Sequence, residues 1–381
     1  MSSPRIRARL RHLVAAIVAA AGCAVPSPEQ AGPAVERISA GIAFYEARAS
    51  NDPVDRTARR QLVGRYGERF ALAADFGDIA RAEALAREVI VTSLDRSRDW
   101  SRLSSVLLMQ HRFAEALAAA DSARRHDPAD RDAIGSYFDA ALAIGHYPDA
   151  YSALQPLPPH AVSTLARRVG WYLAVGNATA AAGTQRAICT TLEQSAAGAV
   201  SRAWCLTEVG RLADEPTEAS AAFEAALRIQ PGYRGAIEGL ASLALAAGRW
   251  EHATRLYRSI LSAAHPDLYR RLAAAERGLG NHDRAEKLEA EFRRVVAGDA
   301  QEALQGPEII RASLAKGAAG REAALTVALR EVERRPTLES WTLLVEVHRA
   351  LGDESAAQQA EQELHAIRAT ISQARPGAPA R

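Results

Sequence analysis

The 381-residue sequence contains little lysine, cysteine or aromatic side chain. Lys287 and Lys316 are its only lysines, so arginine carries nearly all of the positive charge. The chain has three cysteines, and aromatic residues make up 6% of it. After the N-terminal region, no stretch alternates polar and apolar residues strictly, and none is a β-branched run bounded by turns. These absences favour an all-α fold.

The common catalytic and cofactor motifs are also missing. There is no G-x-x-x-x-G-K-[ST], H-E-x-x-H, G-x-S-x-G or C-x-x-C in the sequence. The ten histidines are scattered, and His111, His252 and His282 stand at or beside expected turns, where capping or solvation accounts for them. We therefore expect no enzyme activity, no catalytic residue, no metal site and no cofactor.

Charge gives no indication of a nucleic-acid partner. Segment 1–22 holds four of the 47 basic side chains and no acidic one, so 43 basic side chains remain against 45 acidic ones. A chain so evenly balanced lacks the basic surface that nucleic acid requires. We expect no nucleic-acid binding.

The N-terminus has the pattern of a secretory signal peptide. Met1–His12 contains four arginines and no acid, and Leu13–Gly22 is apolar and uncharged. Ten apolar residues are too few to cross a bilayer, which takes about 20. A basic start, a short apolar run and small residues at its end are typical of a cleaved signal.

The end of this run, Ala20-Ala21-Gly22-Cys23, resembles the bacterial lipoprotein box, in which cleavage precedes a lipidated cysteine. Ala20 departs from the leucine that the family favours there. The resemblance implies a signal peptide over 1–22, lipidation of Cys23, and a flexible tether over 23–33. Ala24, in place of aspartate, favours the outer membrane in a two-membrane envelope. An ordinary cleaved signal with a coincidental cysteine is the alternative.

A pattern of small and large apolar residues recurs at a period of about 34 residues, in the range typical of repeat architectures. It is clearest over 99–154 and 200–292. Phe113 and Ala116 are followed one period later by Tyr147 and Ala150. Each unit has small residues among leucines, a turn, and then small and aromatic residues spaced four and three apart. Small residues let two helices approach closely, and larger ones fill the gap to the next pair.

This pattern resembles the tetratricopeptide repeat family, a 34-residue helix–turn–helix with W-x2-L-G-x2-Y, A-x3-F and a closing proline. The resemblance implies a right-handed α-solenoid of about eight or nine antiparallel helix pairs over 34–370, with a disordered tail over 371–381. Residues 156–198 are the most degenerate part, because Gln185 stands where an aromatic residue is expected.

In this family the first helices of successive pairs line a groove for extended peptides or partner helices. The lysines and asparagines of the groove type that grips a C-terminal carboxylate are absent here, which disfavours chaperone-tail binding. The alternative is that these positions are merely solvated helix faces. By register, the candidate groove residues are Arg98, Ser101, Ser105, Asp132, Asp139, Glu238, Ser242, Arg270, Arg277, Glu346 and Arg349.

Cys189 and Cys205 remain if Cys23 is lipidated, an even number for an oxidising compartment. They lie about equally far from an expected loop near 195–198, so antiparallel helices would bring them to one level. Spacing does not show whether they face each other. A disulfide and two buried thiols both remain open.

Two functions follow from these patterns. The first is a lipid-anchored scaffold that binds partner proteins at the cell envelope, in the assembly or export of surface structures. The second is a periplasmic ligand-binding or cell-wall-glycan-acting protein, with its site in the degenerate region 156–198.

Overall fold

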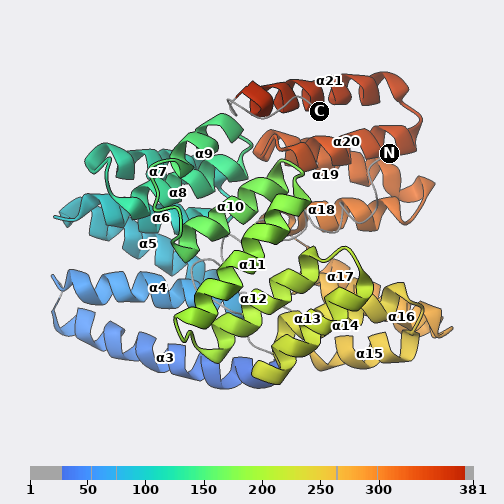
Figure 1. Ribbon diagram of the computed structural model, residues 1–381, viewed down its shortest axis with the longest axis horizontal. Coiled ribbons are helices and arrows are strands. Elements are labelled where there is room, and N and C mark those ends of the chain that lie inside the picture. The colour runs from blue at the N-terminus through green and yellow to red at the C-terminus, as the bar shows by residue number, and fades with distance from the viewer. Residues whose placement is uncertain (1–27, 53, 74, 263–264, 298, 374–381) are drawn as a thin grey trace.

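The computed structural model describes residues 28–52, 54–73, 75–262, 265–297 and 299–373. These residues form nineteen helices and no strand, which confirms the all-α fold (Figure 1). The helices are α3 (Pro28–Asn51), α4 (Arg56–Ala73), α5 (Phe76–Thr92), α6 (Arg96–Met109), α7 (Phe113–His126), α8 (Arg131–Ala143), α9 (Tyr147–Leu154), α10 (Val162–Ala174), α11 (Ala178–Gln194), α12 (Ala199–Leu212), α13 (Pro216–Ile229), α14 (Arg234–Ala246), α15 (Trp250–Ser259), α16 (Asp267–Gly278), α17 (His282–Val295), α18 (Asp299–Leu314), α19 (Ala318–Arg334), α20 (Leu338–Leu351) and α21 (Glu354–Gln373).

From α4 onward the described helices form nine antiparallel pairs, α4–α5 to α20–α21, and most successive pairs pack on one another. This confirms the predicted solenoid of helix pairs. Two boundaries differ from the prediction. The first helix begins at Pro28, inside the predicted tether, and α21 extends to Gln373, past the predicted end at 370. Ile371 is buried, and this packing explains why the helix continues. Cys23 lies outside the described residues.

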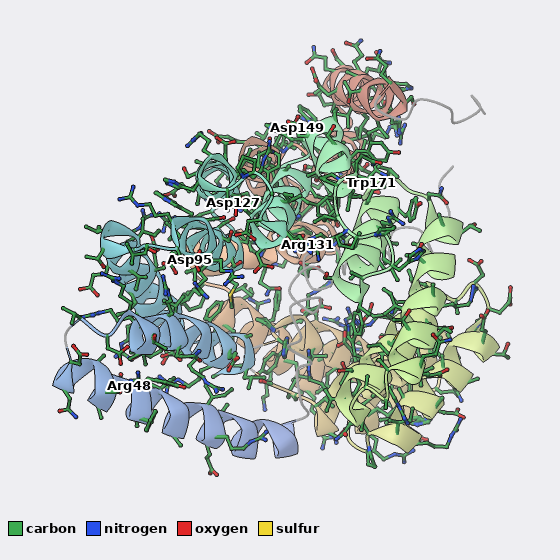
Figure 2. The ribbon with its side chains drawn as sticks, turned by 60° about the vertical axis from the view of Figure 1, so that its left-hand side comes forward. Arg48, Asp95, Asp127, Arg131, Asp149 and Trp171 are labelled. Atoms are coloured by element: carbon green, nitrogen blue, oxygen red, sulfur yellow. A yellow bond between two sulfur atoms is a disulfide. The ribbon has the colours of Figure 1, made fainter. Side chains whose placement is uncertain are left out.

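Small residues set the distance between helices within a pair. In α7, Ala116, Ala120 and Ala123 are spaced four and three residues apart, and each is fully buried. Residues at this spacing share one helix face, so α6 can approach α7 without a large side chain between them. Aromatic side chains fill the wider gaps between pairs. Trp171 of α10, labelled in Figure 2, is buried, and its ring contacts those of Tyr147 and Tyr151 of α9.

A left-handed residue ends the turn inside most of these pairs. Gly145 and Gly280 have φ values of 75° and 78°, a region that glycine enters without steric cost. His111 occupies the same place in the α6–α7 pair with a φ of 56°. The predicted turn position of His111 is therefore correct.

The last pair returns to the third pair. The Tyr147 hydroxyl accepts a hydrogen bond of 3.0 Å from the backbone N–H of Leu338, at the start of α20. Ile371 of α21 belongs to the same apolar cluster as Tyr147 and Trp171, and α21 contacts α9. Figure 1 shows these helices together at the top of the view. We call this contact between α8–α9 and α20–α21 the seam.

The seam depends on a close backbone approach at Gly145. A Cβ atom at this position would lie 2.6 Å from the carbonyl oxygen of Pro336, closer than real Cβ contacts. Two segments that are far apart in sequence therefore meet where only glycine fits.

Candidate partner-binding face

The first helices of three adjacent pairs, α12, α14 and α16, carry a group of interacting charged side chains. Each of these side chains is mostly buried but exposes between 11% and 19% of its surface. They are therefore dehydrated enough to interact strongly, yet solvent reaches them. We call this group the central charged cluster; its members are Glu208, Arg211, Arg234, Glu238, Asp267 and Arg271.

Helix geometry accounts for the order within the cluster. Arg234 and Asp267 are the first residues of α14 and α16, and Glu238 and Arg271 lie four residues further on. Residues four apart share a helix face. Both helices therefore present a charged pair at the same level, with the signs reversed. Packing of successive pairs brings Glu238 opposite Arg271.

Glu238 is shared among three arginines. Its carboxylate oxygens lie 3.4 Å from Arg271, 3.7 Å from Arg234 and 3.9 Å from Arg211. These separations exceed the 2.7–2.9 Å that is typical of a charge-assisted hydrogen bond. One carboxylate thus neutralises several guanidinium groups without binding any of the three closely.

Asp267 and Ser242 accept hydrogen bonds from the two arginines Arg270 and Arg271. Burial alone would raise the pKa of Asp267, but Arg271 and Arg270 hold it well below its usual range. Arg270 lies 2.8 Å from the Asp267 carboxylate. Arg271 also donates a 3.0 Å hydrogen bond to the Ser242 hydroxyl, which lies 3.0 Å from the hydroxyl of Tyr257. Arg271 is therefore fixed in place.

Arg234 is held differently from its neighbours. Among the described residues, its only ion pair is the 3.7 Å contact with Glu238, and its buried Nε has no hydrogen-bond partner. Burial, opposed by Glu238 and reinforced by Arg211, lowers its pKa. The Nε2 atom of His265, just before α16, is likewise buried without a partner there. Burial and the nearby Arg234 lower the pKa of His265 to about 3, so this imidazole is neutral at pH 7.

The charged side chains continue onto α18 and α20. Arg311 donates a 3.0 Å hydrogen bond to Glu339 and lies 3.5 Å from Glu308. Burial raises the pKa of Glu308, Asp267 and Glu339 add to the effect, and Arg311 opposes it. Five successive first helices thus carry charges that act on one another.

Asp139 and Arg167 form a separate pair between α8 and α10. Two hydrogen bonds of 3.0 and 2.8 Å run from the guanidinium to the carboxylate. Burial raises the pKa of Asp139, although Arg167 opposes the shift. Asp139, one of the predicted groove residues, therefore links the first helices α8 and α10 through Arg167.

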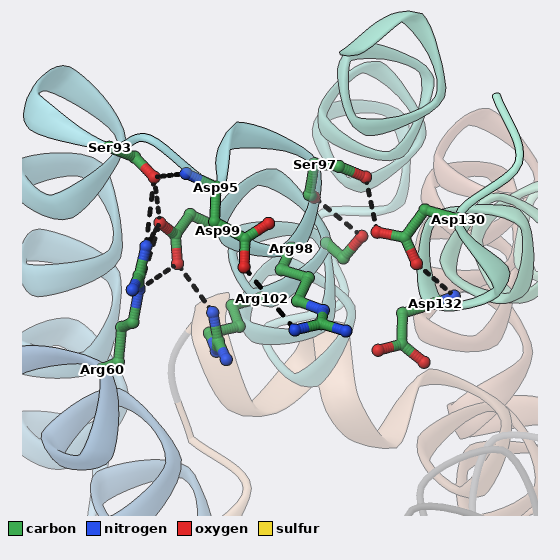
Figure 3. Close-up of polar contacts among 10 residues, drawn as sticks. Arg60, Ser93, Asp95, Ser97, Arg98, Asp99, Arg102, Asp130 and Asp132 are labelled. Carbon is green, nitrogen blue, oxygen red and sulfur yellow. Dashed lines mark hydrogen bonds and ion pairs between the residues drawn. The ribbon is translucent and has the colours of Figure 1, made fainter. Parts of the chain in front are cut away.

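Of the remaining predicted residues on α6 and α8, Arg98, Ser105 and Asp132 are exposed, whereas Ser101 is buried. Figure 3 shows Arg98 and Asp132 with the polar contacts around them. The Ser101 and Ser105 hydroxyls donate to backbone carbonyls of their own helix, at 3.0 and 3.1 Å. Arg98 is exposed and lies 3.7 Å from Asp95. Asp132 is exposed in the first turn of α8. These side chains lie apart from the central charged cluster.

The other predicted residues divide into two groups. Ser242 and Arg270 contact the central charged cluster, and Glu238 belongs to it. Arg277 and Arg349 instead reach the second helix of their own pair, where they form ion pairs of 2.5 Å with Glu289 and 2.8 Å with Glu361. Glu346 of α20 is half-buried.

Several members of this charged face are not among the predicted residues. One signal in the sequence points to them, namely opposite charges one repeat apart at the same helix level, as for Glu238 and Arg271. The members that the prediction omitted are Arg167, Glu208, Arg211, Arg234, Asp267, Arg271, Glu308, Arg311 and Glu339.

The degenerate region forms a regular helix pair, α10–α11. Gln185 is buried, and its side-chain amide lies 3.4 Å from the backbone oxygen and 3.3 Å from the sulfur of Cys205. The structure joins Cys205 of α12 to Cys189 of α11 by a disulfide, with the Cα atoms 5.6 Å apart. A polar side chain and a crosslink thus replace the expected aromatic contact.

Neither a metal-binding cluster nor a membrane-spanning helix is found among the described residues. No group of three or more histidine, cysteine, aspartate or glutamate side chains in them has the arrangement of a metal site. None of their helices has both the length and the apolar character needed to span a bilayer.

The described chain is thus an α-solenoid of helix pairs whose first helices carry an interacting set of charges. Residues 107–168, which include α7, α8 and α9, match the tetratricopeptide repeat family. Repeats of this kind are typical of non-catalytic scaffolds that bind other proteins. No curated protein matches the chain.

Three solved structures are similar to parts of the chain at low sequence identity. A tetratricopeptide repeat protein from Parabacteroides merdae is 16% identical, with a TM-score of 0.46, over 65% of this chain and 97% of its own. PilF of Pseudomonas aeruginosa is 15% identical, with a TM-score of 0.40, over 54% and 95%. PilW, described as a type IV pilus biogenesis factor, is 15% identical, with a TM-score of 0.40, over 56% and 99%.

Proposed function

We propose that the protein is a lipid-anchored scaffold of the bacterial cell envelope that binds partner proteins through its first helices and has no catalytic activity of its own. The central charged cluster carries this proposal. It places partly solvated charges on consecutive first helices, the surface on which solenoids of this kind bind extended ligands. The N-terminal sequence supports the anchor and, through Ala24, the outer membrane.

The proposed binding mode follows from the burial of the cluster. Desolvated charges select a partner by complementarity, because a partner group of the wrong sign leaves a buried charge unpaired. The exposed side chains of α6, including Arg98 and Ser105, would extend the contact over a longer stretch of partner.

In-cell crosslinking followed by capture of the tagged protein and mass spectrometry tests the binding face. We expect one dominant envelope protein, and we expect its yield to fall at least tenfold when Arg98 and Arg270 are both changed to glutamate. The matched control is Arg255→Glu, an exposed arginine on the second helix α15. Equal yields from the double variant and the control would contradict a face on the first helices.

Fractionation of cells that express Cys23→Ser tests the anchor. A lipidated protein partitions with membranes, and the variant should move to the soluble periplasmic fraction. Unchanged membrane partition of the variant would contradict lipidation at Cys23. Because this measurement does not involve the partner, it separates the anchor from the binding face.

A further inference from the structure

Arg234 shares its one ion-pair partner among the described residues with two other arginines. The charged side chains that act on its guanidinium are Arg211 and Arg271, both positive, and Glu238. Arg211 already donates a 2.6 Å hydrogen bond to Glu208, and Arg271 is hydrogen-bonded to Asp267 and Ser242. Glu238 is therefore the carboxylate nearest to Arg234, and it is shared with the other two arginines.

The hydrogen-bonding capacity of Arg234 is unused. A guanidinium has five N–H donors in a rigid fork, and no hydrogen bond of the described residues starts from Arg234. Its Nε is shut off from solvent, whereas the two Nη nitrogens are not among the buried unpartnered atoms. An external group can therefore reach the Nη donors. A mostly buried arginine without a close acceptor is costly in free energy, because its lost hydration is not replaced.

The nearby His265 adds a second buried and unpartnered polar atom, Nε2. Arg234 and Glu238 both act electrostatically on this imidazole. As a neutral ring it contributes no further positive charge, and its Nε2 is available for a hydrogen bond. Arg234 of α14 and His265, just before α16, thus each leave one buried polar atom without a partner.

We propose that Arg234, with Arg211 and Arg271 beside it and His265 nearby, binds an oxyanion, either a carboxylate or a phosphate. A carboxylate or a phosphate can accept two parallel hydrogen bonds from a guanidinium through two of its oxygens. It would supply the close acceptor that Arg234 lacks. Its negative charge would also balance positive charge that Glu238 alone does not neutralise. Binding requires no covalent step, and it does not depend on the scaffold function.

Thermal unfolding of the full mature protein tests the site. Sodium phosphate and sodium acetate are each titrated from 1 to 100 mM, with sodium chloride keeping the ionic strength constant. A site with a dissociation constant of about 1 mM should raise Tm by about 2–3 °C at 20–50 mM ligand. Arg234→Met should abolish this rise, and Arg255→Met, an exposed arginine of α15, should keep it.

The outcomes distinguish the two ligands. A rise with phosphate alone assigns a phosphoryl ligand, and a rise with acetate assigns a carboxylate. No rise above the chloride control with either anion would overturn the proposal, as would an equal rise in Arg234→Met and the wild type. Far-UV circular dichroism establishes that each variant is folded, so loss of the rise is not mistaken for unfolding. Because the probes are inorganic phosphate and acetate, failure here leaves the crosslinking test of the scaffold unaffected.

Discussion

Asp78 near the N-terminus and Glu238 in the middle of the solenoid contact their arginines at different distances. Asp78 is fully buried, and Arg69 donates two hydrogen bonds of 2.7 Å to it. In the central charged cluster, Glu238 faces three arginines, and none of the three is closer than 3.4 Å.

A second carboxylate near the N-terminus also has close hydrogen-bond donors. Asp99 is also buried, and it accepts hydrogen bonds from Arg60, Arg102 and Ser93 (Figure 3). A buried charge with a close partner holds helices together, and removal of one partner leaves the other uncompensated. A buried charge without a close acceptor, such as Arg234, lowers the stability of the fold unless a ligand pairs with it. The difference separates structural charges from candidate binding charges.

The largest expected effect comes from breaking a close pair. Arg69→Met leaves the buried carboxylate of Asp78 without its bidentate partner. We expect a loss of about 3 kcal/mol in the free energy of unfolding, measured by chemical denaturation. The matched control is Arg65→Met on the same helix, whose partner Glu68 is partly exposed; it should change stability by less than about 1 kcal/mol. Similar losses in both variants would remove the basis of the comparison.

Lowering the pH should reduce the free energy of unfolding, because His265 takes up a proton more readily in the unfolded chain. Its pKa is about 3 in the folded state and 6.5 ordinarily, so the unfolded chain binds the proton more readily. The stability that neutral His265 contributes is present above pH 6.5 and is lost as the pH falls toward 3. Between pH 7 and 5 the loss is about 2 kcal/mol.

His265→Gln isolates this effect from the titration of other groups in the protein. From pH 7 to pH 5, the wild type should lose about 2 kcal/mol more unfolding free energy than the variant. A difference between the two proteins that is constant over this range would show that the imidazole titrates normally.

The seam provides a third kind of contact, in which shape and a neutral hydrogen bond replace charge. Gly145→Ala introduces a Cβ against the Pro336 carbonyl oxygen at a left-handed φ, and should cost about 2 kcal/mol. Tyr147→Phe removes only the hydrogen bond to Leu338 and should cost about 1 kcal/mol. Small-angle X-ray scattering should show a larger radius of gyration for Gly145→Ala; an unchanged radius would mean that the seam adapts.

The smallest expected effect is the most informative for the comparison. Arg234→Met removes a mostly buried cation that has no close acceptor and replaces it with an apolar side chain. We expect a change in unfolding free energy within about 1 kcal/mol, or a gain. A loss as large as that of Arg69→Met would place Arg234 among the structural charges.

The repeat could be predicted because it depends on local spacing. Ala116, Ala120 and Ala123 mark a helix face by their intervals alone, and the turn at Gly145 follows from its place between two such faces. The face of Glu238 and Ser242 could be predicted in the same way. The partners of Arg277 and Arg349 could not, because a long arginine side chain reaches in several directions and only packing selects one.

The sequence by itself determined the all-α class, the period of the helix pairs and the helices that carry the charged face, because these depend on residues within one or two turns of each other. The tertiary structure alone decided which charges are held closely and which are shared. It also decided that α20 and α21 return to α8 and α9. These outcomes depend on small rotations between successive pairs. The rotations add up along nine pairs, so the sequence of a single repeat does not determine them.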